Sequence, residues 1–113
     1  MTNNMKIPIQ TAGNSAFSWN GKIIIGGGES DRQLKVHHEV IAFNTDSNTW
    51  NNWPNLNTGR HGTGFARVAN YIYTASGCGN RGGTPELVSI ERLKLPEHHS
   101  NTYLKVRIPQ QFL

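Results

Sequence analysis

The chain has 113 residues, and its 11 Lys and Arg against 7 Asp and Glu give a net charge of +4. Only 16% of the residues are charged, compared with about 25% in an average domain, so the positive sign reflects missing acids rather than a basic surface. Twelve glycines and many asparagines are typical of turns and exclude a coiled coil or a helical bundle. We expect an all-β fold.

One cysteine, Cys78, excludes an internal disulfide framework and a cysteine-rich zinc site. No apolar run approaches the roughly 20 residues that a membrane helix needs. Residues 1–10 also lack the apolar segment of a signal peptide. The sequence therefore predicts neither a membrane partner nor a signal peptide, and it leaves the cellular compartment open.

The first half of the chain predicts four short antiparallel strands. Residues 15–19 and 22–25 are two β-prone runs separated by Asn20-Gly21, and this dipeptide is a strong signal for a two-residue hairpin turn. The second run ends at the glycines Gly26, Gly27 and Gly28, and a polar loop follows. Residues 39–43 predict a third strand, and residues 49–53 a fourth strand that ends at Pro54.

The pattern then begins again, with strands predicted over residues 62–69, 71–75 and 87–95. When the two halves are compared at a constant offset of 50 without a gap, turns, glycines and apolar positions coincide. The matched pairs are Ala16 with Ala66, Asn20 with Asn70, Ile23 with Tyr73, Gly27 with Gly77, Val40 with Ile90, and Phe43 with Leu93. A period near 50 is typical of one class of β-propeller repeat. A last strand over residues 103–108 completes the second half.

These residues resemble kelch repeats, the blades of β-propellers that also occur in galactose oxidase-like proteins. In the first half the resemblance rests on Gly27-Gly28, on Phe43 where the family usually has Tyr, and on Trp50 seven positions later. The segment 58–64, which includes Arg60, His61 and Gly62, resembles the start of a kelch blade. The second half matches less well, because Gly77-Cys78, Leu93 and Ser100 replace the glycine pair, the aromatic residue and the tryptophan.

The resemblance implies an incomplete propeller of about two four-stranded antiparallel blades. The boundaries are residues 1–10 for a lead-in, 11–54 and 55–108 for the two blades, and 109–113 for a tail. Phe43 and Trp50 are expected to pack against a neighbouring blade, and Gly27, Gly28, Gly62 and Gly77 to permit bends and close backbone approach. Because propellers typically have about 4–8 blades, we expect further blades in a longer chain, or self-association that closes a ring.

Antiparallel strands place the loop between the second and third strands, and the connection between blades, at one end of the sheets. A rigid scaffold often presents binding residues on such loops. The candidate binding residues there are cationic or carry histidine: Arg32, His37, His38, Arg60, His61 and Arg81. Arginine pairs with carboxylates through two hydrogen bonds, so this rim suits an acidic peptide or a sugar carboxylate. The alternative is that Arg60 and His61 only fix the turn between blades, while His37 and His38 are solvated.

Other chemistry finds little support. Adjacent histidines on a strand point to opposite faces, so His37-His38 and His98-His99 do not predict a metal site, and no cofactor is expected. The lysines and arginines are scattered, which argues against nucleic acid as a partner. Cys78 has no histidine nearby in sequence, and the copper ligands of galactose oxidase cannot be mapped onto this chain.

The sequence thus favours a noncatalytic kelch-repeat scaffold that binds a protein or carbohydrate ligand through loops on one face. The alternative is a fragment of a propeller enzyme whose active site lies mainly in blades outside this sequence. A remnant without function is a third reading.

Overall fold

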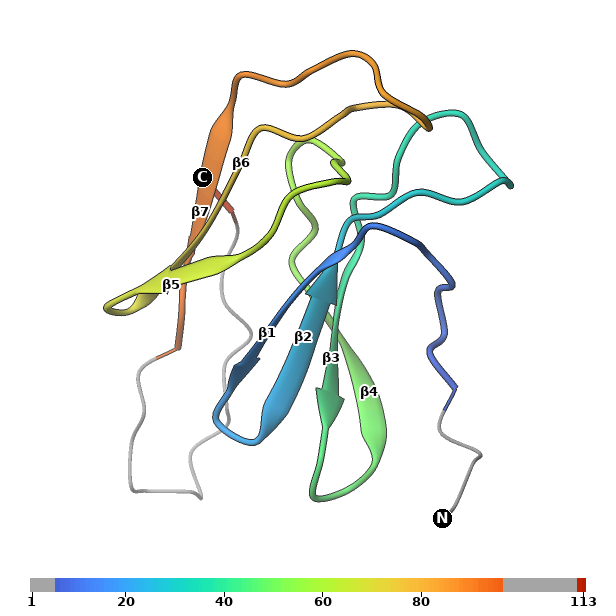
Figure 1. The fold of residues 1–113 in the computed structure, drawn as a ribbon. Coiled ribbons are helices and arrows are strands. Elements are labelled where there is room, and N and C mark those ends of the chain that lie inside the picture. The colour runs from blue at the N-terminus through green and yellow to red at the C-terminus, as the bar shows by residue number, and fades with distance from the viewer. Residues whose placement is uncertain (1–5, 97–111) are drawn as a thin grey trace.

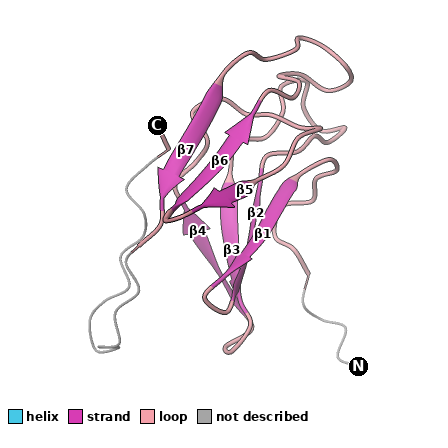
Figure 2. Ribbon diagram, turned by 60° about the vertical axis from the view of Figure 1, so that its left-hand side comes forward, coloured by secondary structure: helices cyan, strands magenta, loops and turns pink. Residues whose placement is uncertain are grey.

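The computed structural model describes residues 6–96 and 112–113. This part of the chain is all-β, contains no helix, and forms two antiparallel sheets (Figures 1 and 2). The first sheet contains, in sequence order, β1 (Ser15–Trp19), β2 (Lys22–Gly26), β3 (Val40–Asn44) and β4 (Thr49–Trp53). The second contains β5 (Ala66–Val68), β6 (Tyr71–Ala75) and β7 (Ile90–Lys94). The all-β expectation is confirmed.

The predicted hairpin turn is present between β1 and β2. Asn20 and Gly21 have φ values of 51° and 72°, the two positive values that a two-residue hairpin turn of this type requires. The turn sets the register that pairs Trp19 with Lys22 and Phe17 with Ile24. The predicted bounds of β1, β4 and β6 agree with the structure, and those of β2 and β3 differ by one residue.

Two predicted strands are too long. The strand expected over residues 62–69 is reduced to β5: Gly62 and Ala69 have φ of +75° and +53°, outside the range of a strand, and residues 63–65 are irregular. The strand expected over 87–95 begins only at Ile90, because the Leu87 N–H donates to the Gly77 carbonyl in the loop. The strand expected over 103–108 lies outside the described residues.

The chain instead meets the free edge of β7 at Phe112. Phe112 is paired with Leu93, and the backbones of Arg92 and Leu113 exchange two hydrogen bonds of 2.6 Å each. Phe112–Leu113 therefore lies where a fourth strand of the second sheet would be. The Phe112 side chain is only 2% exposed and stacks on Phe65 at 6.3 Å between ring centroids.

The repeat is present, but its constant offset of 50 is wrong. The bridge Ala12–Glu29 corresponds to His61–Cys78, and the strand pair Phe17–Ile24 to Ala66–Tyr73, so the offset is 49 in the first hairpin. Between β2 and β3, the pair Ile24–Ala42 corresponds to Tyr73–Arg92, which makes the offset of the third strand 50. One additional residue therefore lies in the loop between β6 and β7, where it leaves the strand register intact.

The core lies between the two sheets. From the first sheet it receives Trp19, Ile24, Val40, Ala42 and Trp53, and from the second sheet and its flanks Ile72, Leu93, Leu95 and Phe112, with Leu56 from the connection. Phe43 and Trp50 are outside this cluster. They pair across β3 and β4 at 4.9 Å on the opposite face of the first sheet and are only half-buried. The tryptophans of the core are therefore Trp19 and Trp53.

Glycines permit close contact where the connection between the sheets passes the residues that follow β2. A Cβ at Gly27 would overlap the carbonyl oxygen of Arg60, and Gly27 also has φ of +70°. The Gly28 N–H donates to this same carbonyl at 2.9 Å. Added Cβ atoms at Gly28 and Gly77 would also collide with neighbours, whereas one at Gly62 would meet open space. The connection can pass this closely only because the glycines leave room.

Candidate ligand-binding loop face

Three connections meet at one end of the two sheets, the upper end in Figure 1. They are the β2–β3 loop (residues 27–39), the β6–β7 loop (residues 76–89) and the β4–β5 connection (residues 54–65). Backbone hydrogen bonds join the two loops: Val36 N–H donates to the Gly79 carbonyl at 3.3 Å, and Arg81 N–H to the Leu34 carbonyl at 2.7 Å. The loops thus form one face, which we call the loop face.

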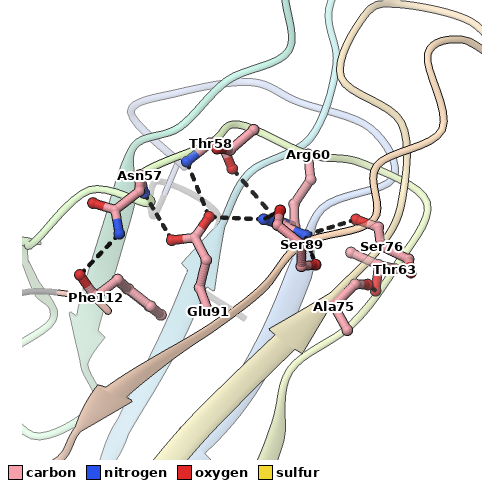
Figure 3. Close-up of polar contacts among 9 residues, drawn as sticks. All are labelled: Asn57, Thr58, Arg60, Thr63, Ala75, Ser76, Ser89, Glu91 and Phe112. Atoms are coloured by element: carbon pink, nitrogen blue, oxygen red, sulfur yellow. Dashed lines mark hydrogen bonds and ion pairs between the residues drawn. The ribbon is translucent and has the colours of Figure 1, made fainter.

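Arg60 is not on the exposed rim, where its place in the sequence predicts it. It is only 1% exposed, and its guanidinium is surrounded by acceptors (Figure 3). One terminal nitrogen donates to the carbonyls of Ser76 and Ser89 at 2.9 and 3.0 Å. The other donates to the Ser89 hydroxyl at 2.9 Å and to Glu91 at 2.8 Å. A side chain with its donors engaged inside the protein has none to offer a ligand, so the expectation of an exposed Arg60 is wrong.

Glu91 is the centre of this buried network. Besides Arg60, its carboxylate accepts hydrogen bonds from the backbone N–H groups of Asn57 and Thr58 at 2.8 and 2.9 Å. The Asn57 side-chain amide donates in turn to the Phe112 carbonyl at 2.9 Å (Figure 3). Glu91 thereby ties the connection to β7 and compensates the buried charge of Arg60. The sequence does not reveal this role of Glu91. Glu91 stands in a strand, and the alternation of side chains between the two faces of a strand does not show which face another sheet will cover.

His61 is also largely buried and joins the two loops. Its Nε2 lies 2.9 Å from the Asn80 carbonyl, and its Nδ1 lies 3.5 Å from a carboxylate oxygen of Glu29. The other carboxylate oxygen of Glu29 accepts the Gly82 N–H at 3.0 Å. His61 therefore connects the β2–β3 and β6–β7 loops, and its side chain is 10% exposed.

His37 is buried rather than solvated, whereas the adjacent His38 is exposed. The Nε2 of His37 lies 2.8 Å from the Ser30 hydroxyl, and its Nδ1 lies 3.3 Å from Glu39. Glu39 also accepts the His38 N–H at 3.2 Å. Burial raises the pKa of Glu39, but a backbone hydrogen bond and the nearby His37 outweigh burial, so the pKa is lowered. The carboxylate is thus held ionised beside His37.

Arg32 and Arg81 are exposed and lie on the loop face. Arg32 donates one hydrogen bond to the Gln10 carbonyl at 2.8 Å, and Arg81 one to the Asp31 carbonyl at 3.1 Å. These single bonds orient both guanidinium groups. Beside them is an open depression lined by Gln10, Thr11, Ala12, Glu29, Ser30, Asp31 and Arg32. Of the six candidate binding residues, Arg32, Arg81 and His38 are therefore accessible, and Arg60, His61 and His37 support the face from inside.

Among the described residues, no group of three or more His, Cys, Asp and Glu side chains is arranged to hold a metal ion. The same part of the chain contains no helix that is long and apolar enough to cross a membrane. Cys78, which is half-buried, pairs through its backbone with His61 and Glu86.

Models of known protein families and curated protein sequences give no match to this chain.

Proposed function

We propose that this chain is a kelch-type β-propeller segment that serves as a noncatalytic interaction scaffold. Two consecutive antiparallel sheets, with strands in sequence order and equivalent registers, support the blade assignment. The observation that carries the binding role is the loop face, where Arg32 lines the open depression and Arg81 donates to Asp31 in its wall. Loops on a rigid sheet scaffold commonly bind ligands.

The ligand that this face suits is a protein or carbohydrate with carboxylate groups. Each exposed guanidinium uses one nitrogen to donate to a backbone carbonyl and keeps further N–H groups for a carboxylate. Gln10 and Asp31 also line the depression, and amide and carboxylate side chains can bind the hydroxyl groups of a ligand. Oligosaccharides of uronic acids combine both kinds of group.

The test is a titration of the ¹⁵N-labelled chain, followed by NMR, with a galacturonate oligosaccharide and, separately, with a peptide rich in Asp and Glu. We expect shift changes in residues 29–32 and 79–82, and about tenfold or greater weakening in Arg32→Ala and in Arg81→Ala, because each removes charge-assisted hydrogen bonds. Arg67→Ala is the matched control, since Arg67 is an exposed cation on β5. If both loop variants bind like the parent chain, the site assignment fails.

A second candidate is a fragment of a propeller enzyme, and one observation favours it. Ser30, His37 and Glu39 form a hydroxyl–imidazole–carboxylate series with contacts of 2.8 and 3.3 Å, the connectivity that activates a serine nucleophile. A fluorophosphonate reagent tests this candidate by mass spectrometry. Labelling of Ser30 that is lost in His37→Gln supports it, and an unlabelled Ser30 excludes a nucleophile at this position.

A further inference from the structure

The two sheets pack through opposite faces of the same repeat. The first sheet turns Trp19, Ile24 and Val40 toward the core, and their equivalents in the second sheet are Val68, Tyr73 and Ile90. The second sheet turns Ile72 and Leu93 toward the core, and their equivalents in the first sheet are Ile23 and Phe43. The face that is buried in one sheet is therefore the outer face in the other.

Such a contact is heterologous, and within residues 6–96 and 112–113 it leaves one copy of each face without a partner sheet. The outer face of the first sheet contains Ile23, Ile25, Ile41, Phe43 and Trp50. The outer face of the second sheet contains Val68, Tyr71, Tyr73, Ile90 and Arg92. Three of these apolar side chains are well exposed, namely Ile23 at 41%, Val68 at 61% and Ile90 at 63%. Val68 and Ile90 share the outer face of the second sheet, and exposed apolar residues on one sheet face favour an interaction surface.

We propose that the outer face of the first sheet binds the outer face of the second sheet of another copy of this chain. The inference rests on the blade assignment of the proposed function. The internal packing identifies the binding partner. Position by position, the two outer faces are equivalent to the two faces that already pack against each other between the sheets of one chain. A second copy of the chain presents both of these faces, so its binding would repeat the contact that the two sheets make within one chain.

The cation on the outer face of the second sheet is compatible with this contact. The Arg92 guanidinium lies over the Tyr71 ring at 4.4 Å, so it is stacked along the sheet and covers an aromatic surface. The opposing face offers the aromatic pair Phe43 and Trp50. A planar guanidinium stacks readily between aromatic rings.

The contact between copies lacks the buried ion pair of the internal one. The residues equivalent to Arg60 and Glu91 are Thr11 and Ile41, which cannot form it. Association therefore depends on apolar contact and is weaker than the joining of the two sheets within a chain. A heterologous contact that closes gives a ring, and with two sheets per chain the typical 4–8 blades correspond to about two to four copies.

The experiment uses two variants of the full chain, each with one face blocked. Ile23→Glu blocks the outer face of the first sheet, and Ile90→Glu blocks that of the second. We expect the parent chain to associate with increasing concentration in sedimentation velocity, and each variant alone to stay monomeric. A mixture of the two variants should form a 1:1 dimer and nothing larger, because each retains the face that the other has lost.

Leu34→Glu is the control, because Leu34 is 62% exposed but lies in the β2–β3 loop, and this variant should associate like the parent chain. A parent chain that stays monomeric at several hundred micromolar overturns the proposal, as does a mixture of blocked variants that fails to dimerise. The loop face takes no part in this contact. Ligand binding by the monomeric variants would therefore preserve the proposed function even if association failed.

Discussion

Replacing Glu91 by glutamine should destabilise the chain strongly. The carboxylate accepts three hydrogen bonds, from the Arg60 guanidinium and from the Asn57 and Thr58 amides. Glutamine is close in shape, but it removes the charge and turns one acceptor into a donor that faces another donor. Removing one partner from a buried ion pair costs about 3–5 kcal/mol, against a total stability of about 5–15 kcal/mol for a typical domain.

The assay is urea unfolding followed by tryptophan fluorescence, since Trp19 and Trp53 are 8% and 7% exposed in the core. Glu86→Gln is the control, because Glu86 is an exposed glutamate. A loss below about 1 kcal/mol in Glu91→Gln, the range of exposed ion pairs, would refute the assignment of Glu91 as the anchor of the connection. A double variant with Arg60→Met and Glu91→Leu should lose less than the sum of the single variants, because it leaves no buried charge unpaired.

Three further predictions concern backbone, core and pH. Gly27→Ala should lower the free energy of unfolding, measured with urea, several times more than Gly62→Ala. Both glycines have positive φ, which costs alanine about 1–2 kcal/mol, but only at Gly27 would the added methyl group collide with the backbone. Phe112→Ala should lower the free energy of unfolding by about 3–5 kcal/mol in the same assay, because this ring is buried against Phe65. The lowered pKa of Glu39 stabilises the fold above its unfolded value of 4.5, and this contribution disappears as the pH falls through the lower folded pKa. The difference in unfolding midpoint between the parent chain and Glu39→Gln should therefore shrink as the pH falls below 4.5, and a difference that is independent of pH would contradict this account.

Local signals predicted most of the first sheet. Asn20-Gly21 determines a turn whose register follows from its length, and the β-branched run after it can hardly form anything but a strand. The sequence could not reveal the additional residue in the β6–β7 loop, because a gapless comparison still matches β-prone residues with β-prone residues. The offset of 49 becomes visible only in the strand pairs.

The candidate site was harder to predict, because burial of polar groups depends on their partners. Arg60 and Glu91 are 31 positions apart in sequence, and neither residue alone indicates that the other neutralises it. The tryptophans illustrate the same difficulty. Trp50 and Trp53 stand on one strand but on opposite faces, and only the position of the second sheet decides which of them is in the core.

The contact between the two long loops has a consequence for how this protein can vary. Part of what fixes their relative position is hydrogen bonds between backbone groups, such as those of Val36 with Gly79 and Arg81 with Leu34, beside the side-chain contacts of His61, Glu29 and Arg81. Such bonds need no particular side chain at most positions. The other loop positions can therefore vary in sequence while the backbone frame of the loop face is kept.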